Sequence, residues 1–573
     1  MAYNKTTWST GDVISADKLN NAESGIETAS LASDLPRVDL TGDTTAMTGD
    51  VAVPLQFRFR DGQQDVLAYA STKWQGDTSQ GYPKKNLSFK FYSDSDLSKK
   101  LKWKPKSSWK KDNSFNLKAN WIDRTEARNL VNAQIQAQTF ASTPLYYGNA
   151  NSIPANYSQV EANKAVQFLF LDSFIDKDYL SQQLTLSCDV QLVEDNGTGN
   201  NEAKIYFTSK ANTDSGAAFG DANTIDLSSV AVGSSSHYTM TFTPAAGYWF
   251  DKLIMLPGTV YSTPTAHILV KNISLTATST DPGTYAPSVA DNHAMLASAA
   301  NYGAIQGFPV EMYLNGVDQG LYTFNTRKDN NLMNMDSSNN SHILIDVETI
   351  TLNESAYALN GVDGSVITPD ATADVIAAFN RLAQFVNESA DADFVAQIAQ
   401  YVDLYSVIDT AILRLAMENI DGDGKSILYG TYDGRTWFTV PYDLDSTWQL
   451  YFDGSNIQPL WNAGHFYFSS KLLSRVINLF PTQVKKRYIK LRQRTLSAGN
   501  INKLFKDFID GIPTIAFDNN ETIWPAIPSI QLTDFAQIQQ SVTGCLSVAD
   551  KMLNAQIVST ADGSVVDTSG QPQ

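Results

Sequence analysis

The spacing of apolar residues first marks out the β-rich parts of the chain. Within residues 55–92, the alternating runs LQFRFR and NLSFKFY predict strands on either side of a loop from Trp74 to Lys85. A second β-rich region covers residues 165–280, where charged residues become rare and runs such as QLTLSCDVQLV and HYTMTFT follow at short intervals. This change of texture predicts a β-sandwich that is separate from the first strands.

Beyond residue 300 the pattern becomes mixed α and β. The stretch GFPVEMYLNGVDQGLYTFN predicts a hairpin whose turn is Asn315-Gly316. Helical periodicity follows over residues 371–420, 468–497 and 532–556. Polar stretches with Pro and Gly flank the β-sandwich, as expected where one domain is inserted into another. We therefore predict a multidomain α+β protein in which an all-β sandwich interrupts a mixed α/β domain.

A short helix is predicted near the N-terminus. Leu19, Ala22, Ile26 and Ala29 recur at spacings of 3, 4 and 3, which suits the seam of a coiled coil or an amphipathic helix packed on its own domain. Two heptads are too few to associate alone, so a coiled coil here needs neighbouring chains or a docking partner.

Length and charge narrow the function classes. A chain of 573 residues is too long to fold around a single hydrophobic core, so two to four domains are expected. The formal net charge of −18 repels phosphate backbones, which argues against a nucleic-acid partner. Residues 84–128 are an exception, with 13 Lys and Arg against 5 Asp and Glu. This basic island suits an anionic ligand or an ordinary solvated face.

The cysteines and the apolar runs exclude further classes. Cys188 and Cys545 lie far apart without a metal-binding spacing, so neither a disulfide framework nor a zinc site is predicted. No apolar run approaches the length of a membrane span, and the first residues lack the apolar core of a signal peptide. We expect synthesis in the cytoplasm and no membrane insertion.

Two acidic clusters carry the strongest chemical signal. One follows Glu418 in ENIDGDGKSILY, and the other is PYDLDSTW, which contains Asp443 and Asp445. A hairpin between the clusters can bring their carboxylates together, and Mg²⁺ and phosphoryl transfer both need such oxygens. An EF-hand loop fits poorly because Lys425 occupies the place of the third ligand. Two polar surface turns are the remaining alternative.

Four sequence blocks in order resemble the CotH kinase family, that of spore coat protein H. They are GYPKKN, LKANWIDRTEARN, GFPVEMYLNGVDQGLYTFNTRKD, and the pair NIDGDGKSILY and PYDLDSTW. The resemblance covers about residues 50–150 and 300–555 and implies an atypical kinase-like α/β fold. It also implies Mg²⁺ and ATP as cofactors of an ATP-dependent protein phosphotransferase.

The resemblance assigns roles to residues of this chain. Asp421 and Lys118 would be catalytic, with Asp421 orienting or deprotonating the acceptor hydroxyl and Lys118 pairing with phosphates. The resemblance also implies residues that bind nucleotide (Gly76, Lys84, Lys85) and residues that bind metal (Asp443, Asp445, Ser426). Ser426 stands where a kinase catalytic loop has a metal-binding Asn, and Thr326-Arg327-Lys328 replaces the family's usual acidic position. A kinase-like fold kept as a scaffold is therefore the alternative. For Asp123 and Arg128 we favour a structural ion-pair network.

The opening W-x-x-G-D-V-I-x-A-x-K-L-N-x-x-E-x-G-I resembles the N-termini of bacteriophage tail-fibre and baseplate proteins. That resemblance implies a place in the virion, at the tail tip or baseplate, after synthesis in the host cytoplasm. It also implies other tail proteins as partners and a homotrimer.

The β-sandwich resembles carbohydrate-binding jelly rolls in its Ser- and Thr-rich strands and its closing VKNISL segment. Tyr238, Tyr248 and Trp249 are the candidate saccharide contacts, because aromatic faces stack on sugars. Each ring is alternatively part of the sandwich core. The resemblance implies host cell-wall polysaccharide as ligand and a structural Ca²⁺ without named ligands.

These observations give a predicted domain order. Residues 1–40 form a docking or oligomerisation segment, 41–162 and 283–558 the two parts of the kinase-like domain, 163–282 the sandwich and 559–573 a flexible tail. The predicted function is host adhesion as a tail or baseplate component with a kinase-like domain. The alternatives are an active ATP- and Mg²⁺-dependent kinase acting on a partner or on itself, and a purely structural spacer.

Overall fold

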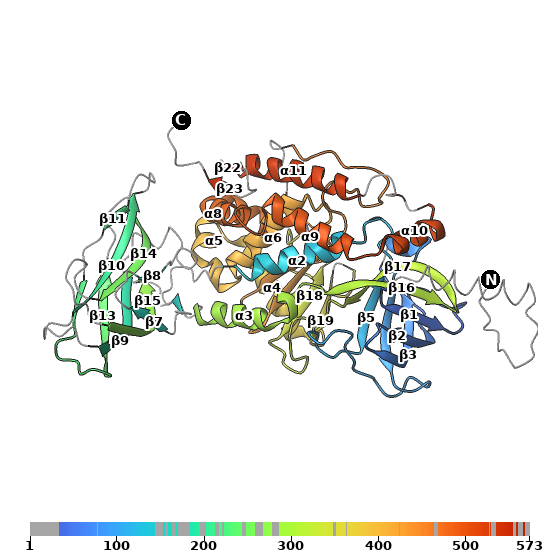
Figure 1. Ribbon diagram of the computed structural model, residues 1–573, viewed down its shortest axis with the longest axis horizontal. Coiled ribbons are helices and arrows are strands. Elements are labelled where there is room, and N and C mark those ends of the chain that lie inside the picture. The colour runs from blue at the N-terminus through green and yellow to red at the C-terminus, as the bar shows by residue number, and fades with distance from the viewer. Residues whose placement is uncertain are drawn as a thin grey trace, which may run out of the picture.

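The chain folds into a β-barrel, a helical part and a separate β-rich lobe (Figure 1). The computed structural model describes residues 34–76, 78–143, 286–347, 351–362, 364–422, 425–462, 468–526, 528 and 534–553, the strands between 153 and 277 with residues 227–234, and two short strands near the C-terminus. The helix predicted around residues 19–29 lies outside these residues.

Seven strands close the barrel, in the order β1-β16-β17-β5-β4-β3-β2. Their bounds are β1 (Arg37–Thr41), β2 (Val53–Arg60), β3 (Asp65–Trp74), β4 (Leu87–Tyr92), β5 (Ser114–Lys118), β16 (Gly307–Leu314) and β17 (Val317–Thr326). The strands predicted at LQFRFR and NLSFKFY and the hairpin at Asn315-Gly316 are confirmed. Two of the seven strands follow residue 300, so the barrel joins segments that are far apart in sequence.

Alternation of apolar and polar residues in β2, β4 and β5 explains the barrel interior. In β2 every second residue is buried, and the same alternation places Phe89, Phe91 and Phe115 inside. These rings pack with Phe57 and Phe324, at centroid separations of 4.5 to 6.4 Å for the pairs that touch. The alternate residues of β4 and β5 are polar and face outward, which leaves that wall of the barrel free to form a site.

The helical part surrounds a four-stranded sheet of order β19-β18-β20-β21. Its strands are β18 (Ile343–Val347), β19 (Gly364–Thr368), β20 (Ile427–Thr431) and β21 (Phe438–Pro441). Its helices are α2 (Arg128–Phe140), α3 (Ala286–Ser298), α4 (Ala373–Glu388), α5 (Asp391–Gln397), α6 (Leu404–Met417), α7 (Lys471–Leu479), α8 (Pro481–Arg492), α9 (Ala498–Asp510), α10 (Thr514–Ile523) and α11 (Phe535–Met552). The three regions with predicted helical periodicity all contain helices.

Helix α6 is the centre of this part and leads directly to the first acidic cluster. Every one of its residues is buried, and it packs against α7, α8, α11 and β21. The Asp403 carboxylate accepts a hydrogen bond from the Ser406 amide and caps the helix start. The helix ends at Met417, and the next residue, Glu418, has a left-handed φ of 49° that turns the chain toward Asp421.

The strands between residues 153 and 277 form two five-stranded sheets. One contains β8 (Gln167–Leu169), β10 (Glu202–Ala211), β11 (Ala217–Phe219), β12 (Asn223–Asp226) and β14 (Tyr248–Pro257). The other contains β6 (Ile153–Pro154), β7 (Gln159–Ala162), β9 (Leu184–Glu194), β13 (Ser235–Phe242) and β15 (His267–Ala277). The two sheets agree with a predicted β-rich unit in this region. The jelly-roll topology of that unit stays a prediction.

Three observations complete the fold. Within the described part of the chain, no helix is both long and apolar enough to cross a membrane. Cys188 and Cys545 are both buried, and both are free thiols rather than partners in a disulfide. Two short strands, β22 (Ile557–Ser559) and β23 (Val565–Asp567), pair with each other, and β23 lies within the stretch 559–573 that was predicted as a C-terminal tail.

Candidate active site

A cavity of about 930 Å³ lies between the barrel and the helical part. On the barrel side it is lined by the loop after β3 and by the outer faces of β5 and β17. On the other side it is lined by the start of α2, by the turn at Asp421 and by the turn after β21. Both acidic clusters predicted from the sequence therefore open onto one cleft.

Lys118 reaches this cleft because of the alternation in β5. Phe115 and Leu117 point into the barrel, so Asn116 and Lys118 point outward. The Lys118 Nζ lies 3.3 Å from Asp443 Oδ1 on the opposite side of the cleft. Burial lowers the pKa of Lys118, but the charges of Asp443 and Asp445 outweigh that effect and hold the pKa above its ordinary value.

The turn that carries Asp443 is held by α2. The Asn129 carboxamide accepts a hydrogen bond from the Leu444 amide at 3.2 Å. The Asn132 Nδ2 donates to the Leu444 carbonyl at 2.8 Å and to Thr447 Oγ1 at 2.7 Å. Asp443 itself has a left-handed φ of 54°. Because both sides of the turn are tied to one helix, its carboxylates are fixed before any ligand arrives.

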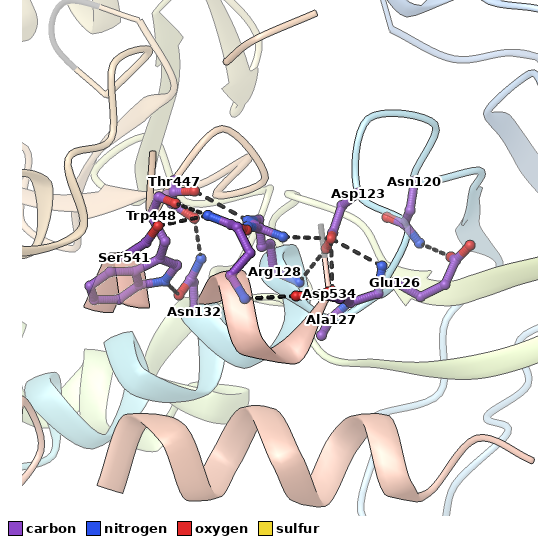
Figure 2. Close-up of polar contacts among 12 residues, drawn as sticks. Asn120, Asp123, Glu126, Ala127, Arg128, Asn132, Thr447, Trp448, Asp534 and Ser541 are labelled. Atoms are coloured by element: carbon purple, nitrogen blue, oxygen red, sulfur yellow. Dashed lines mark hydrogen bonds and ion pairs between the residues drawn. The ribbon is translucent and has the colours of Figure 1, made fainter. Parts of the chain in front are cut away.

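Buried Arg128 supports the same turn from behind (Figure 2). Its guanidinium donates to Asp123 Oδ1 at 2.7 Å, to the Thr447 carbonyl at 3.2 Å and to Gln537 Oε1 on α11 at 2.6 Å. The prediction of a structural ion-pair network for Asp123 and Arg128 is confirmed.

The carboxylates of the cleft differ in charge state. The ammonium of Lys118 lowers the pKa of Asp443, burial opposes that effect, and Lys328 reinforces it. Burial and then the charge of Asp443 raise the pKa of Asp445 to about 7. Burial also raises the pKa of Asp421, while Lys425 lowers it and Asp443 raises it. The cleft thus holds one firmly ionised carboxylate beside two that retain protons more readily.

Residues 293–547 match the family described as CotH kinase protein. They form a CotH kinase domain. Asp421, Asp443 and Asp445 lie inside the matched segment, whereas Lys118 precedes it and enters the same cleft from the barrel.

The other comparisons add little to the CotH kinase domain. No curated protein matches the chain significantly. Among solved structures, a match is the N-terminal endo-1,4-beta-D-xylanase 10B of Clostridium thermocellum, solved as its CBM22-1-GH10 modules with xylohexaose, at 10% identity and a TM-score of 0.16. The match covers 24% of this chain and 27% of that one, so the chain spans about a quarter of the xylanase structure.

The carboxylates of the cleft suit a Mg²⁺ ion whose remaining ligands are phosphate oxygens better than they suit a metal ion held by protein side chains alone. Among the described residues, no three His, Cys, Asp or Glu side chains converge on one point. Mg²⁺ usually takes one or two carboxylates and completes its shell with phosphates and water. Asp443 and Asp445 supply two carboxylates whose mutual repulsion, visible in the raised pKa of Asp445, a cation would relieve. Ser426 also lines the cleft and is 3% exposed.

Two lysines predicted to contact nucleotide lie away from the cleft lining. Lys84 is buried, with its Nζ 3.5 Å from Glu126 Oε1 and 3.1 Å from Asn520 Oδ1 on α10. Lys85 donates to the carbonyls of Gln80 and Tyr82, which closes the loop on itself. The structure therefore gives both lysines roles in holding the loop and the barrel together.

Gly76 does lie in the cleft lining, as predicted. Its φ is +98°, and an added Cβ would fall 2.1 Å from Ser79 Oγ. A side chain at this position would be strained and would collide with Ser79, so the loop after β3 requires glycine here.

Other residues that line the cleft were not among the predicted site residues. Asn86, Asn116, Asn129, Asn325, Lys328 and Lys425 all line the cleft. Lys328 lies 2.5 Å from Asp346 and 3.7 Å from the centre of the Tyr442 ring. The outward positions of β5 were a usable signal for Asn116, since they alternate with buried aromatic and aliphatic residues.

The predicted saccharide contacts have mixed placements. Tyr238 on β13 is opposite buried Cys188 on β9, and its hydroxyl donates to the Asp226 carbonyl at 3.1 Å. It therefore lies on the inner side of its sheet. Tyr248 and Trp249 open β14, and their side chains lie outside the described residues.

The raised pKa of Asp445 makes the free energy of unfolding depend on pH. Because the folded pKa of Asp445 is about 7 and the ordinary value is 3.8, folding takes up a proton between those values. This group's contribution to the free energy of unfolding therefore falls as pH rises from about 4 to about 7 and is constant above. We expect Asp445→Asn to stabilise the protein at pH 8, without Mg²⁺, by about 1–2 kcal/mol, a value reduced for its partial exposure.

Thermal melts at pH 5 and pH 8 check this expectation. The Asn variant should gain clearly more stability at pH 8 than at pH 5. Asp453→Asn is the control, because Asp453 lies on an exposed loop and its pKa is lowered by its hydrogen bonds to Ser455. Equal gains at both pH values would contradict the assignment.

Proposed function

We propose that the cleft binds a Mg²⁺-bound nucleoside triphosphate and transfers its terminal phosphoryl group to a protein hydroxyl. The observation that carries the proposal is the ion pair of Lys118 and Asp443 across the cleft, at 3.3 Å. An ammonium on one wall suits phosphate oxygens, and an ionised carboxylate on the other suits the accompanying cation. The family match supports the same reaction class.

Each charged residue has a distinct task in this proposal. Lys118 pairs with phosphate oxygens and keeps the chain of phosphates in line with the acceptor. Asp443 and Asp445 would hold Mg²⁺, which supplies charge neutralisation on the transferred group when bound. Asp421 accepts the proton that the acceptor hydroxyl loses as its oxygen bonds to the terminal phosphorus, while the bond from that phosphorus to the bridging oxygen of the leaving nucleoside diphosphate breaks. Its raised pKa makes it a more effective base than an ordinary Asp.

Calorimetric titration of the full chain with Mg²⁺-ATP tests the proposal. We expect saturable binding that Lys118→Met weakens at least tenfold, because a charged phosphate contact is lost. Lys90→Met is the matched control, since Lys90 is exposed on the neighbouring strand β4 and absent from the cleft lining. Absence of saturable binding at millimolar nucleotide would overturn the proposal.

Host adhesion is a second proposed function. One observation favours it: the outer face of the β9 and β13 pair carries a hydrogen-bonded polar row. His237 Nε2 lies 2.8 Å from Ser187 Oγ, and its Nδ1 lies 2.6 Å from Asp189 Oδ1. The His237 side chain is 62% exposed, so these groups are available to sugar hydroxyls. Sedimentation of the protein with purified cell walls, compared with His237→Ala, tests this role; equal sedimentation of both proteins would contradict a contact at this row.

Assembly into a phage tail or baseplate as a homotrimer is part of this second proposal. It is supported by the sequence of the first 26 residues, which lie outside the described part of the chain. Light scattering of the full chain and of a variant lacking residues 1–33 separates the possibilities. A trimer that becomes a monomer on truncation supports the proposal, and a full-length monomer contradicts it.

A further inference from the structure

A lysine-rich segment between β4 and β5 lies outside the cleft. Residues 99–111 contain seven Lys and neither Asp nor Glu, on a chain whose formal net charge is −18. The segment is the densest part of the basic island at residues 84–128. None of its lysines lines the cleft. Neither the nucleotide site nor the row at His237 therefore accounts for this charge.

Two tryptophans anchor the segment to the barrel core. The Trp109 side chain is buried, and its ring centroid lies 6.1 Å from that of Phe115. The Trp103 ring packs 5.0 Å from the ring of Phe59. The Trp103 amide donates to the Asp112 carbonyl at 2.8 Å, and the Asp112 amide donates back to the Trp103 carbonyl at 2.9 Å. The backbone that carries the lysines is therefore held in a defined extended shape, with its aromatic rings turned into the barrel.

The alternation that turns Trp103 inward turns lysines outward. Leu101 packs against the barrel core beside Trp103, so Lys100 and Lys102 point away from that core. Lys111 is adjacent in sequence to the residue that pairs with Trp103, and it faces outward for the same reason. All three of these outward lysines are exposed. Among the described residues, no carboxylate lies within ion-pair distance of their ammonium groups.

Exposed lysines on the helical part are arranged differently. Lys503 and Lys506 of α9 form ion pairs with Asp507 and Asp510, each one turn further along the helix. The outward lysines have no such compensation and repel one another. A bound polyanion would remove this repulsion and release its own counterions, so both effects favour binding.

We propose that the outward lysines bind a linear polyol phosphate polymer of the host cell wall. Lys100 and Lys102 are about 7 Å apart along the extended backbone, so a polymer with one phosphodiester in each short repeat can pair with both. The lysine ammonium is a compact point charge that suits single phosphate oxygens. The inference goes beyond the adhesion proposed at the His237 row, because it names a second surface and a charged ligand.

The inward direction of the tryptophans decides against a nucleic acid as the polymer. Proteins that bind single strands stack the bases on aromatic rings that are accessible to them. Trp103 and Trp109 instead pack within the barrel core and leave only ammonium groups on the outer side. A polymer without bases needs no stacking surface, and its phosphates meet the lysines directly.

Calorimetric titration of the full chain with poly(glycerol phosphate) tests this inference. We expect saturable binding that weakens about tenfold or more between about 50 and 200 mM salt, because three neutralised phosphates release their counterions. A variant with Lys100→Gln, Lys102→Gln and Lys111→Gln should bind about tenfold or more weakly at low salt and should show a smaller salt dependence.

The matched control carries Lys503→Gln and Lys506→Gln, which remove exposed lysines that already have carboxylate partners. It should bind the polymer like the wild type, and both variants should melt like the wild type because only exposed side chains change. Undiminished binding by the triple variant, or no binding by the wild type, would overturn the inference. Tighter binding of polydeoxythymidylate than of the polyol phosphate would also overturn it. The Mg²⁺-ATP titration and the sedimentation of His237→Ala report on the other proposals separately.

Discussion

Replacing Asp443 with Ala is expected to weaken Mg²⁺-ATP binding by about a hundredfold or more while the protein stays folded. The substitution removes a charged metal ligand, and loss of groups that merely support such ligands already costs roughly 10–100-fold. It also frees Lys118, which lies 3.3 Å from Asp443, to contact phosphates without a competing carboxylate. The loss of the cation should dominate, because the triphosphate then enters a cleft whose remaining carboxylates repel it.

Binding calorimetry with and without Mg²⁺ measures this effect. The Asp443 side chain is 41% exposed, so its removal creates no buried cavity and the melting temperature should change little. Asp453→Ala serves as the matched control, since Asp453 does not itself line the cleft. If Asp443→Ala binds Mg²⁺-ATP as tightly as the wild type, Asp443 is not a metal ligand in this protein.

The acidic residues of the cleft were predictable from sequence because their types and spacing carry the chemistry. Two Asp-rich clusters around a short hairpin indicate convergence, and β20 and β21 bring both to one cleft. Lys118 was also predictable, since it follows the alternation of a strand. These signals are local in sequence, and the local structure preserves them.

The positions of Lys84 and Lys85 could not be predicted from their neighbours in the sequence. They follow the glycine loop directly, which suggested a phosphate contact. The loop folds back at Thr78–Gly81, and Lys84 turns instead toward Glu126 and Asn520, which are 42 and 436 residues away in sequence. A sequence alone gives no sign of such distant partners for a buried lysine.

Asn325 was missed for a related reason. Its neighbour Asn116 lies in β5, which precedes the β-rich lobe in the sequence, whereas Asn325 lies in β17, which follows that lobe. The two residues become neighbours only because β17 pairs with β5 when the barrel closes. Barrel closure depends on strand pairing across about two hundred residues, and propensity carries no information about it. The roof of the cleft therefore becomes visible only in three dimensions.

Replacing Arg128 with Met should destabilise the helical part by about 3–5 kcal/mol, the usual cost of breaking a buried ion pair by removing one partner. The side chains of Arg128 and Asp123 are 0% and 2% exposed. Without the guanidinium, the Asp123 carboxylate remains buried with reduced compensation, and the Thr447 carbonyl loses a donor (Figure 2). Gln537 on α11 also loses a donor. Urea titration followed by tryptophan fluorescence measures the change.

Arg58→Met provides the matched control for this prediction. Arg58 pairs with Asp65 at 2.6 Å, but the two side chains are 46% and 53% exposed. Exposed pairs contribute about 0–1 kcal/mol, so this variant should unfold almost like the wild type. A loss of similar size in both variants would show that burial does not decide the contribution of these pairs. Arg128→Met should also weaken Mg²⁺-ATP binding, because Arg128 holds the Thr447 end of the turn that carries Asp443, and Arg58→Met should not.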